Sequence, residues 1–83
     1  MTSTIEISFY PLNNQYPASV LNFLEKLKSI PGIEINTNGM STILIGPYKS
    51  LWIPLGNLME RQLAGEDCVF VLKIAPGRRE YME

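Results

Sequence analysis

The chain has 83 residues, and its seven Lys and Arg against eight Asp and Glu give a formal net charge of −1. This length predicts one domain over residues 1–83 and excludes two. The balanced charge lacks the field that would attract nucleic acid or an anionic membrane, so we expect neither as a partner. Because 46% of the residues are hydrophobic and a small domain has little interior, we expect a homo-oligomer that covers the surplus apolar surface.

The chemistry that the chain lacks is informative. It has no histidine, which is the commonest general base and metal ligand, and no paired acid–base set. We therefore expect no enzyme and no metal site. Cys68 stands alone, so no internal disulfide forms, and the acidic neighbours Glu66 and Asp67 favour an inert thiol. With no apolar membrane span and no signal segment, these features predict a cytoplasmic protein.

The first half of the chain predicts a strand, a helix and a second strand. Residues 4–10 alternate between apolar and polar side chains, which is typical of a half-buried strand. Residues 17–29 have helical periodicity, and the Pro31-Gly32 pair ends that helix. Its expected apolar face consists of Val20, Leu21, Phe23, Leu24 and Leu27. Residues 33–36 then predict a short second strand.

The second half begins with a hairpin. Asn38-Gly39 predicts a tight turn because both residue types tolerate positive φ, and residues 41–46 return as a central, apolar third strand. Residues 48–64 predict a second helix, in which Pro54 either introduces a kink or begins the regular part. Its expected buried side is Leu51, Trp52, Leu55, Leu58, Met59 and Leu63. Residues 67–74 predict the last strand, and residues 78–83 a loose tail.

The element order β-α-β-β-α-β predicts an α+β, ferredoxin-like sandwich. Two right-handed crossovers give an antiparallel four-stranded sheet in the order 4-1-3-2, with both helices on one face. Ile5, Ile7, Phe9, Phe70, Leu72 and Ile74 should face the helices. The open face should carry Glu6, Ser8, Tyr10, Val69, Val71 and Lys73. Such a mixture of polar and apolar side chains favours a ligand or a partner sheet on that face. An RNA-binding role is disfavoured because the third strand has neither aromatic nor basic residues.

The segment from Thr37 to Thr42, Thr-Asn-Gly-Met-Ser-Thr, allows two interpretations. It can be only a hairpin turn. It can also present hydroxyls, an amide and a thioether to a small polar heteroaromatic ring.

This segment, together with Ile5–Leu12 and Val69–Ile74, resembles the thiamine-binding, YkoF-like family of ferredoxin-like proteins. The resemblance covers residues 5 to about 79. It implies a single-copy member that binds thiamine or its hydroxymethylpyrimidine moiety and forms a homodimer or homotetramer. The family pattern is not matched at Ile43, or in the second helix, which opens with Pro47-Tyr48-Lys49 rather than acidic residues.

We accordingly expect a non-catalytic binding protein that acts in salvage or transport. In this hypothesis a flat aminopyrimidine lies against the open face and the start of the third strand. The candidate ligand-binding residues are Glu6, Ser8, Tyr10, Asn38, Met40, Ser41 and Thr42. For Glu6, a cross-strand pair with Lys73 is the favoured alternative. For Tyr48 and Trp52, packing in the core or between subunits is favoured over a ligand wall. The competing function is a structural or regulatory homo-oligomer whose open face serves only self-association.

Overall fold

The computed structural model describes residues 1–14 and 16–79. Three elements form its first half: strand β1 (Thr2–Pro11), helix α1 (Tyr16–Lys28) and strand β2 (Glu34–Thr37). Three more complete it: strand β3 (Thr42–Pro47), helix α2 (Tyr48–Gly65) and strand β4 (Cys68–Pro76). The expected βαββαβ order is confirmed, and β1 is longer at both ends than the alternating pattern indicated. No helix of the described residues is long and apolar enough to cross a bilayer.

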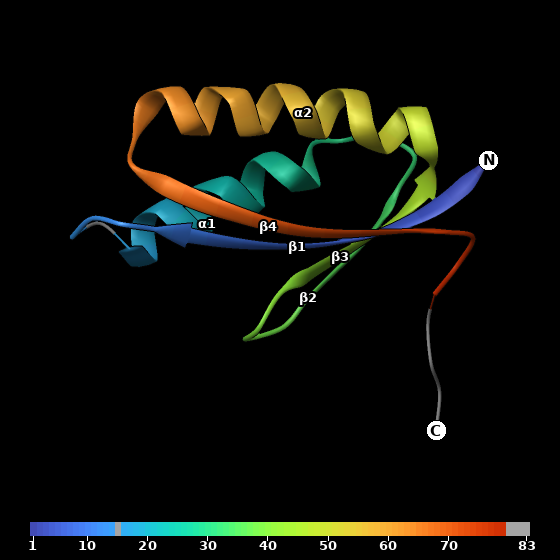
Figure 1. The fold of residues 1–83 in the computed structure, drawn as a ribbon, viewed down its shortest axis with the longest axis horizontal. Coiled ribbons are helices and arrows are strands. Elements are labelled where there is room, and N and C mark those ends of the chain that lie inside the picture. Colours follow the sequence, from blue (N-terminus) through green and yellow to red (C-terminus); the bar gives the residue numbers. More distant parts are fainter. Residues whose placement is uncertain (15, 80–83) are drawn as a thin grey trace.

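The four strands form one antiparallel sheet in the order β2-β3-β1-β4, which is the expected 4-1-3-2 order listed from the other edge. Pairing of β1 with β4 sets Ile7 opposite Leu72, and pairing with β3 sets Ile7 opposite Thr42. Figure 1 shows α2 running along β4, with the β2–β3 hairpin projecting away from α2. Strands β2 and β4 are the two edges of this sheet.

The core lies between the sheet and the two helices. Ile5, Leu27, Leu44, Leu51 and Leu55 are fully buried and join one hydrophobic cluster. They come from β1, α1, β3 and α2, so both helices cover the same face of the sheet, as expected. The odd-numbered residues of β1 and the even-numbered residues of β4 point into this core because side chains alternate along a strand.

Several expected core positions are wrong. Leu21 of α1 is 64% exposed, and Leu63 of α2 is 54% exposed. Trp52 is also among the exposed hydrophobic residues. Gln62 takes a buried place instead, where its Nε2 donates to Glu66 Oε2. The sequence pattern gave each helix too broad an apolar face, because the sheet and the other helix cover only one side of each helix.

Pro54 lies inside α2, which begins at Tyr48, so the helix does not start at the proline. Proline has no backbone N–H, so the carbonyl of Ser50 loses its usual helical donor. Ser50 is exposed, and water can take the place of that donor. The proline is tolerated here because the affected turn faces solvent.

The β2–β3 hairpin forms without positive φ at Asn38 or Gly39, so the expected backbone reason for this turn is wrong. Asn38 Oδ1 instead accepts hydrogen bonds from the backbone N–H groups of Met40 at 2.7 Å and Ser41 at 3.1 Å. An asparagine side chain can replace a backbone carbonyl in this way. Gly32, in the turn between α1 and β2, does have positive φ, at 74°, which glycine adopts without the steric cost of a side chain.

Residues 77–79 are hydrogen-bonded to the sheet, although the tail was expected to be loose from residue 78. Thr4 Oγ1 donates to the carbonyl of Gly77 at 2.8 Å and accepts from the N–H of Arg79 at 3.0 Å. Arg78 forms a two-pronged ion pair with Glu34 of β2. Residues 77–79 therefore cross one end of the open face from β4 to β2. Of the expected loose tail, residues 80–83 lie outside the described residues.

Candidate functional site

A cavity of about 90 Å³ lies at the hairpin end of the sheet, between α1, β1 and the β2–β3 hairpin. Five of the seven sequence candidates line it, namely Ser8, Asn38, Met40, Ser41 and Thr42. Glu6 and Tyr10 are not part of its lining. The cavity opens beside α1 on the helix-covered side of the sheet. The sequence hypothesis had placed the ligand on the open face.

The floor of the cavity is aromatic and aliphatic. Phe9 and Phe23 line it, with ring centroids 5.0 Å apart, and both rings contact Phe70 behind them. Further apolar lining comes from Ile7, Val20, Leu24 and Leu27. A flat ring placed against this floor would replace water with apolar and aromatic contact, which stabilises binding.

Two threonine hydroxyls form the polar side of the cavity. Thr42 is 4% exposed and lies opposite Ile7, so its side chain is on the helix face of β3. Its Oγ1 lies 3.0 Å from Oγ1 of Thr37, and either hydroxyl can donate. One proton joins the pair, so the other hydroxyl proton stays available to a ligand acceptor. Thr37 was not predicted as a site residue. A hairpin whose loop is residues 38–41 pairs Thr37 with Thr42 across the two strands.

Asn38 shapes the hairpin turn and also lines the cavity. Its Oδ1 is engaged with the turn N–H groups, which fixes the orientation of the amide. The Nδ2 group then remains as a hydrogen-bond donor at the cavity. The turn interpretation of the segment from Thr37 to Thr42 is therefore confirmed, and the ligand interpretation stays a prediction, which the turn does not contradict because it uses only one end of the amide.

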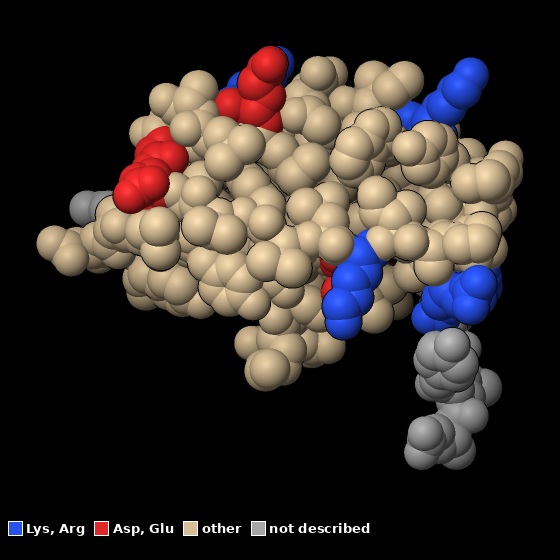
Figure 2. All heavy atoms as spheres, in the orientation of Figure 1, with Lys and Arg blue, Asp and Glu red and all other residues tan. Residues whose placement is uncertain are grey.

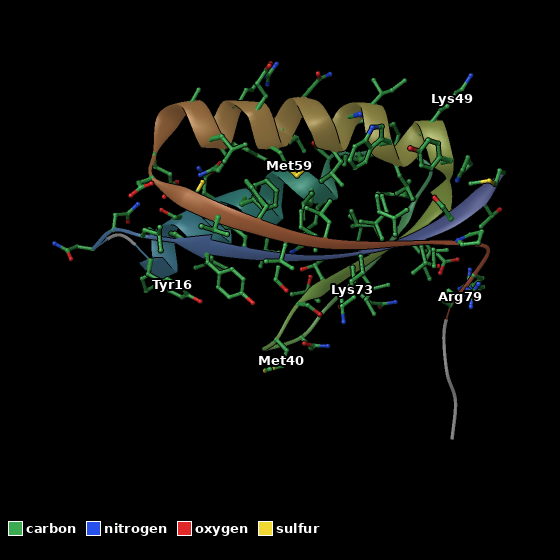
Figure 3. All side chains as sticks on the ribbon, viewed as in Figure 1. Tyr16, Met40, Lys49, Met59, Lys73 and Arg79 are labelled. Atoms are coloured by element: carbon green, nitrogen blue, oxygen red, sulfur yellow. The ribbon has the colours of Figure 1, made fainter. Side chains whose placement is uncertain are left out.

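Glu6 belongs to the open face and not to the cavity. Its Oε2 accepts from Ser41 Oγ at 3.1 Å, and its Oε1 lies 3.8 Å from Lys73 Nζ. The favoured alternative, a cross-strand pair with Lys73, is therefore what the structure contains. Figure 3 shows Lys73 projecting from the sheet on the side away from α2. Among residues 1–14 and 16–79, no Asp, Glu, Lys or Arg lines the cavity, so these residues offer a ligand no charged partner there.

The remaining candidates lie at the rim of the cavity or outside it. Met40 is 85% exposed at the tip of the hairpin, where Figure 3 labels it. Ser8 pairs with Val71, so alternation directs its side chain to the open face and its main chain forms the cavity wall. Tyr10 is exposed on the open face. Tyr16, at the start of α1, lines the cavity and was missed, because a residue before the helical pattern carries no periodic signal.

Two other groups are excluded from the site. Tyr48 and Trp52 stack on each other at 6.4 Å between ring centroids, on α2 and away from the cavity. Burial, reinforced by the charges of Glu66 and Asp67, raises the pKa of the Cys68 thiol, so little thiolate forms at neutral pH. Within residues 1–14 and 16–79, no three Cys, Asp or Glu side chains gather into a metal site.

Comparison with known proteins found similar folds only among solved structures. No family model and no curated protein matches the chain. Solved structures do share its fold. Protein SP2199 from Streptococcus pneumoniae superposes with a TM-score of 0.83 at 18% identity, covering 94% of this chain and 89% of that one. The hypothetical protein MJ1052 from Methanocaldococcus jannaschii gives 0.76 at 23% identity, over 96% and 84%.

A third solved structure bears a functional name. It is the "putative thiamine biosynthesis/salvage protein" TM0486 from Thermotoga maritima, with a TM-score of 0.78 at 17% identity. The superposition covers 89% of this chain and 82% of that one. At these identities the likeness establishes the ferredoxin-like fold, and the function has to be argued from the cavity.

Proposed function

We propose that the protein binds a small heteroaromatic molecule, with an uncharged ring of that molecule in the hairpin cavity, and catalyses no reaction on it. The observation that carries this proposal is the composition of the lining. Aromatic and aliphatic side chains form the floor, while the hydroxyls of Thr37 and Thr42 and the amide of Asn38 form one side. A few polar groups that converge over an apolar floor are typical of a small-molecule site. The absence of histidine, noted above, supports binding without catalysis.

The size of the cavity limits the ligand. Sites for drug-sized ligands usually measure about 300–1,000 Å³. The cavity of about 90 Å³ is much smaller, so it can enclose part of one ring and its substituents. A two-ring molecule such as thiamine would bind through its pyrimidine half, and the other half would extend past Met40 and Tyr16. Hydroxymethylpyrimidine and thiamine are therefore the first ligands to test. The sequence resemblance and the name of the Thermotoga maritima protein support the same choice.

Two threonines provide a matched pair for the test. Thr42 is 4% exposed and lines the cavity, whereas Thr4 is 6% exposed and lies at the opposite end of the sheet. Replacement by valine keeps the side-chain shape and removes one hydroxyl in each case. Titration of hydroxymethylpyrimidine and thiamine, by calorimetry and by amide NMR shifts, should show binding by the wild type and by T4V. T42V should bind about tenfold more weakly, because a lost ligand hydrogen bond costs about 1–1.5 kcal/mol.

The NMR shifts would also locate the ligand. We expect the largest shifts at Ser8, Phe9, Tyr16 and residues 37–42. Absence of heat and of shifts with both ligands at millimolar concentration would reject the proposed ligand class. Shifts confined to Tyr10, Val69 and Val71 would move the ligand to the open face and reject the cavity.

The open face supports a second candidate function, that of a structural or regulatory homo-oligomer. Tyr10, Val69 and Val71 are between 44% and 50% exposed there, and together they form an apolar surface beside the Glu6–Lys73 pair. Face-to-face packing of two sheets would cover this surface. The cavity opens on the other side of the sheet, so this association and ligand binding do not compete.

A further inference from the structure

Strand β1 is longer than the part of β3 that pairs with it. It pairs with β4 as far as Pro11, but with β3 only as far as Ile7, which lies opposite Thr42. Beyond Ile7 the hairpin leaves β1, and Figure 1 shows the hairpin tip apart from that strand. Among the described residues, the last part of β1 therefore has no neighbouring strand on the β3 side, and this is where the cavity lies.

The hydrogen bonds at the two ends of β1 indicate which backbone groups face that side. Toward β4, the carbonyl of Thr2 accepts from the N–H of Gly77, and the N–H of Leu12 donates to the carbonyl of Asp67. Bonded residues alternate along an antiparallel ladder, so the even-numbered residues of β1 direct their backbone groups to β4. The odd-numbered residues direct theirs to the β3 side.

Phe9 is odd-numbered, so its N–H and its carbonyl both face the side that β3 has left. Neither group has a hydrogen-bond partner within residues 1–14 and 16–79. Pro11 faces the same side, and within a sheet proline is confined to positions where its nitrogen has no ladder partner. Because Phe9 also lines the cavity, the cavity has one backbone donor and one backbone acceptor next to each other.

We propose that Phe9 recognises the ligand through its backbone, and that the ligand is a ring with an amino group beside a ring nitrogen. This inference rests on the proposed function, because it concerns the same cavity. The ring nitrogen accepts from the N–H of Phe9, and the amino group donates to the carbonyl of Phe9. The ring thus takes the place that a residue of β3 would have in a longer hairpin. Aminopyrimidines and other amino-substituted nitrogen heterocycles have such an edge.

The short length of the unpaired edge favours a small ring over an extended peptide. A peptide strand that adds to a sheet edge forms hydrogen bonds with every second residue of that edge. Here only Phe9 offers both groups, because Pro11 has no N–H and Ile7 is already paired with Thr42. The rings of Phe9 and Phe23 beside this edge provide an apolar surface for the flat face of a ligand ring.

The surroundings favour an edge without charge. Residues 35–48 contain no Asp, Glu, Lys or Arg, and Figure 2 shows no charged side chain on the visible face of the projecting hairpin tip. The backbone groups of Phe9 are also uncharged. A charged ring would lose hydration here without gaining an opposite charge, which costs free energy. A neutral edge with one donor and one acceptor matches Phe9 without this cost.

Hydrogen exchange tests the unpaired edge without any ligand. The N–H groups of Ser8 and Tyr10 are directed to β4 and should exchange slowly. The N–H of Phe9 between them should exchange at least about tenfold faster. Saturation with hydroxymethylpyrimidine, which has an amino group beside a ring nitrogen, should slow exchange at Phe9 by a larger factor than at Ser8 or Tyr10. Slow exchange at Phe9 in the unliganded protein would overturn the proposal.

Two analogues of hydroxymethylpyrimidine test the amino group. One has a dimethylamino group in its place, and the other has a hydrogen atom. Neither can donate to the carbonyl of Phe9, and the second also adds no bulk. Both should bind at least about tenfold more weakly than hydroxymethylpyrimidine by calorimetry, because a ligand donor is lost and a protein acceptor stays unpaired.

Two substitutions at Phe9 test the backbone donor. Phe9→Leu and Phe9→Pro both remove the aromatic ring, but only the proline variant also removes the N–H. That N–H has no ladder partner, so proline breaks no hydrogen bond of the sheet, and the two variants should have the same circular dichroism. F9P should bind hydroxymethylpyrimidine at least about tenfold more weakly than F9L. If F9P does not fold, the analogues decide.

The results separate this inference from the proposed function. If hydroxymethylpyrimidine shifts the cavity amides but both analogues bind as tightly, recognition by Phe9 is rejected and the binding function is retained. If neither hydroxymethylpyrimidine nor thiamine binds, both are rejected. Weaker binding of both analogues, together with slower exchange at Phe9 in the complex, supports both.

Discussion

The two ends of the sheet each contain a buried threonine, and the two hydroxyls differ in their hydrogen bonding. At the end where the chain finishes, the hydroxyl of Thr4 is fully engaged, because it donates to Gly77 and accepts from Arg79. At the hairpin end, the hydroxyl of Thr42 contacts that of Thr37 and no other hydrogen-bonding group of the described residues, and a cavity remains beside it. The C-terminal segment thus closes one end of the domain, and nothing in the described chain closes the other. The proposed ligand site is therefore at the end of the sheet where polar groups lie over an apolar floor and the described chain does not cover them.

The largest expected effect is on stability, and it comes from the aromatic floor of the cavity at the hairpin end of the sheet. Phe23 is 1% exposed and contacts both Phe9 and Phe70. Phe23→Ala should lower the free energy of unfolding by about 3–5 kcal/mol, through lost burial and the cavity left behind. Urea unfolding followed by circular dichroism measures this change. W52A, which removes an exposed aromatic residue, should cost much less. Equal losses would mean that the aromatic floor contributes no special stability.

The two threonines should differ in stability as well as in binding. T4V leaves the carbonyl of Gly77 and the N–H of Arg79 without their partner, so we expect a loss of about 1–3 kcal/mol. T42V breaks one hydroxyl–hydroxyl contact, and we expect a loss of about 1 kcal/mol or less. The difference between the two urea midpoints measures this contrast. A larger loss for T42V would show that the hairpin end is the more tightly satisfied of the two.

The hairpin itself should depend on one side chain. Asn38→Ala removes the acceptor for the N–H groups of Met40 and Ser41, at a cost of about 0.5–1.5 kcal/mol. Asn38→Asp keeps an acceptor oxygen and should retain most of the stability. Hydrogen exchange of the Ser41 amide should be faster in N38A and close to wild type in N38D. Unchanged exchange in N38A would contradict the side-chain turn.

The smallest expected effect is a pH dependence of stability at the end of the sheet that residues 77–79 cover. The side-chain hydrogen bonds from Arg78 hold the pKa of Glu34 below its usual value, with desolvation acting in the opposite direction. A lowered pKa in the folded state means that this stabilisation is present above the unfolded pKa and is lost as the pH falls through the folded pKa. Unfolding midpoints of E34Q should therefore fall less steeply than those of the wild type between those two pKa values. Parallel curves would mean that the exposed ion pair contributes nothing measurable.

Local pattern predicted the elements well and the helix faces less well. Alternation in β1 correctly assigned Ile5 and Ile7 to the core, and Glu6 to the opposite face, because a strand has only two faces. Helical periodicity included Leu21 and Leu63, which are exposed, because the width of a buried helix face depends on what packs against it. The turn at Asn38 was placed correctly but for the wrong reason, since its side chain replaces the positive φ that the sequence suggested.

The candidate site, like the helices, was predicted only in part from local pattern. The segment from Thr37 to Thr42 was identified from its hydrogen-bonding groups, and most of it does line the cavity. Tyr16 and Phe23 could not be added from local pattern, because they reach the cavity only when α1 packs across the sheet. Glu6 was grouped with the site by its position on a strand, and the register of β4 against β1 directs it to Lys73 instead.

The sequence by itself determined the order of strands and helices, the sheet topology that follows from it, and the lack of histidine chemistry. These depend on periodicity and composition, which are properties of neighbouring residues. Only the tertiary structure decided that the cavity opens beside α1 and that residues 77–79 close the opposite end of the sheet. Those features come from contacts between residues distant in the chain, and no local pattern encodes which groups such contacts will leave unused.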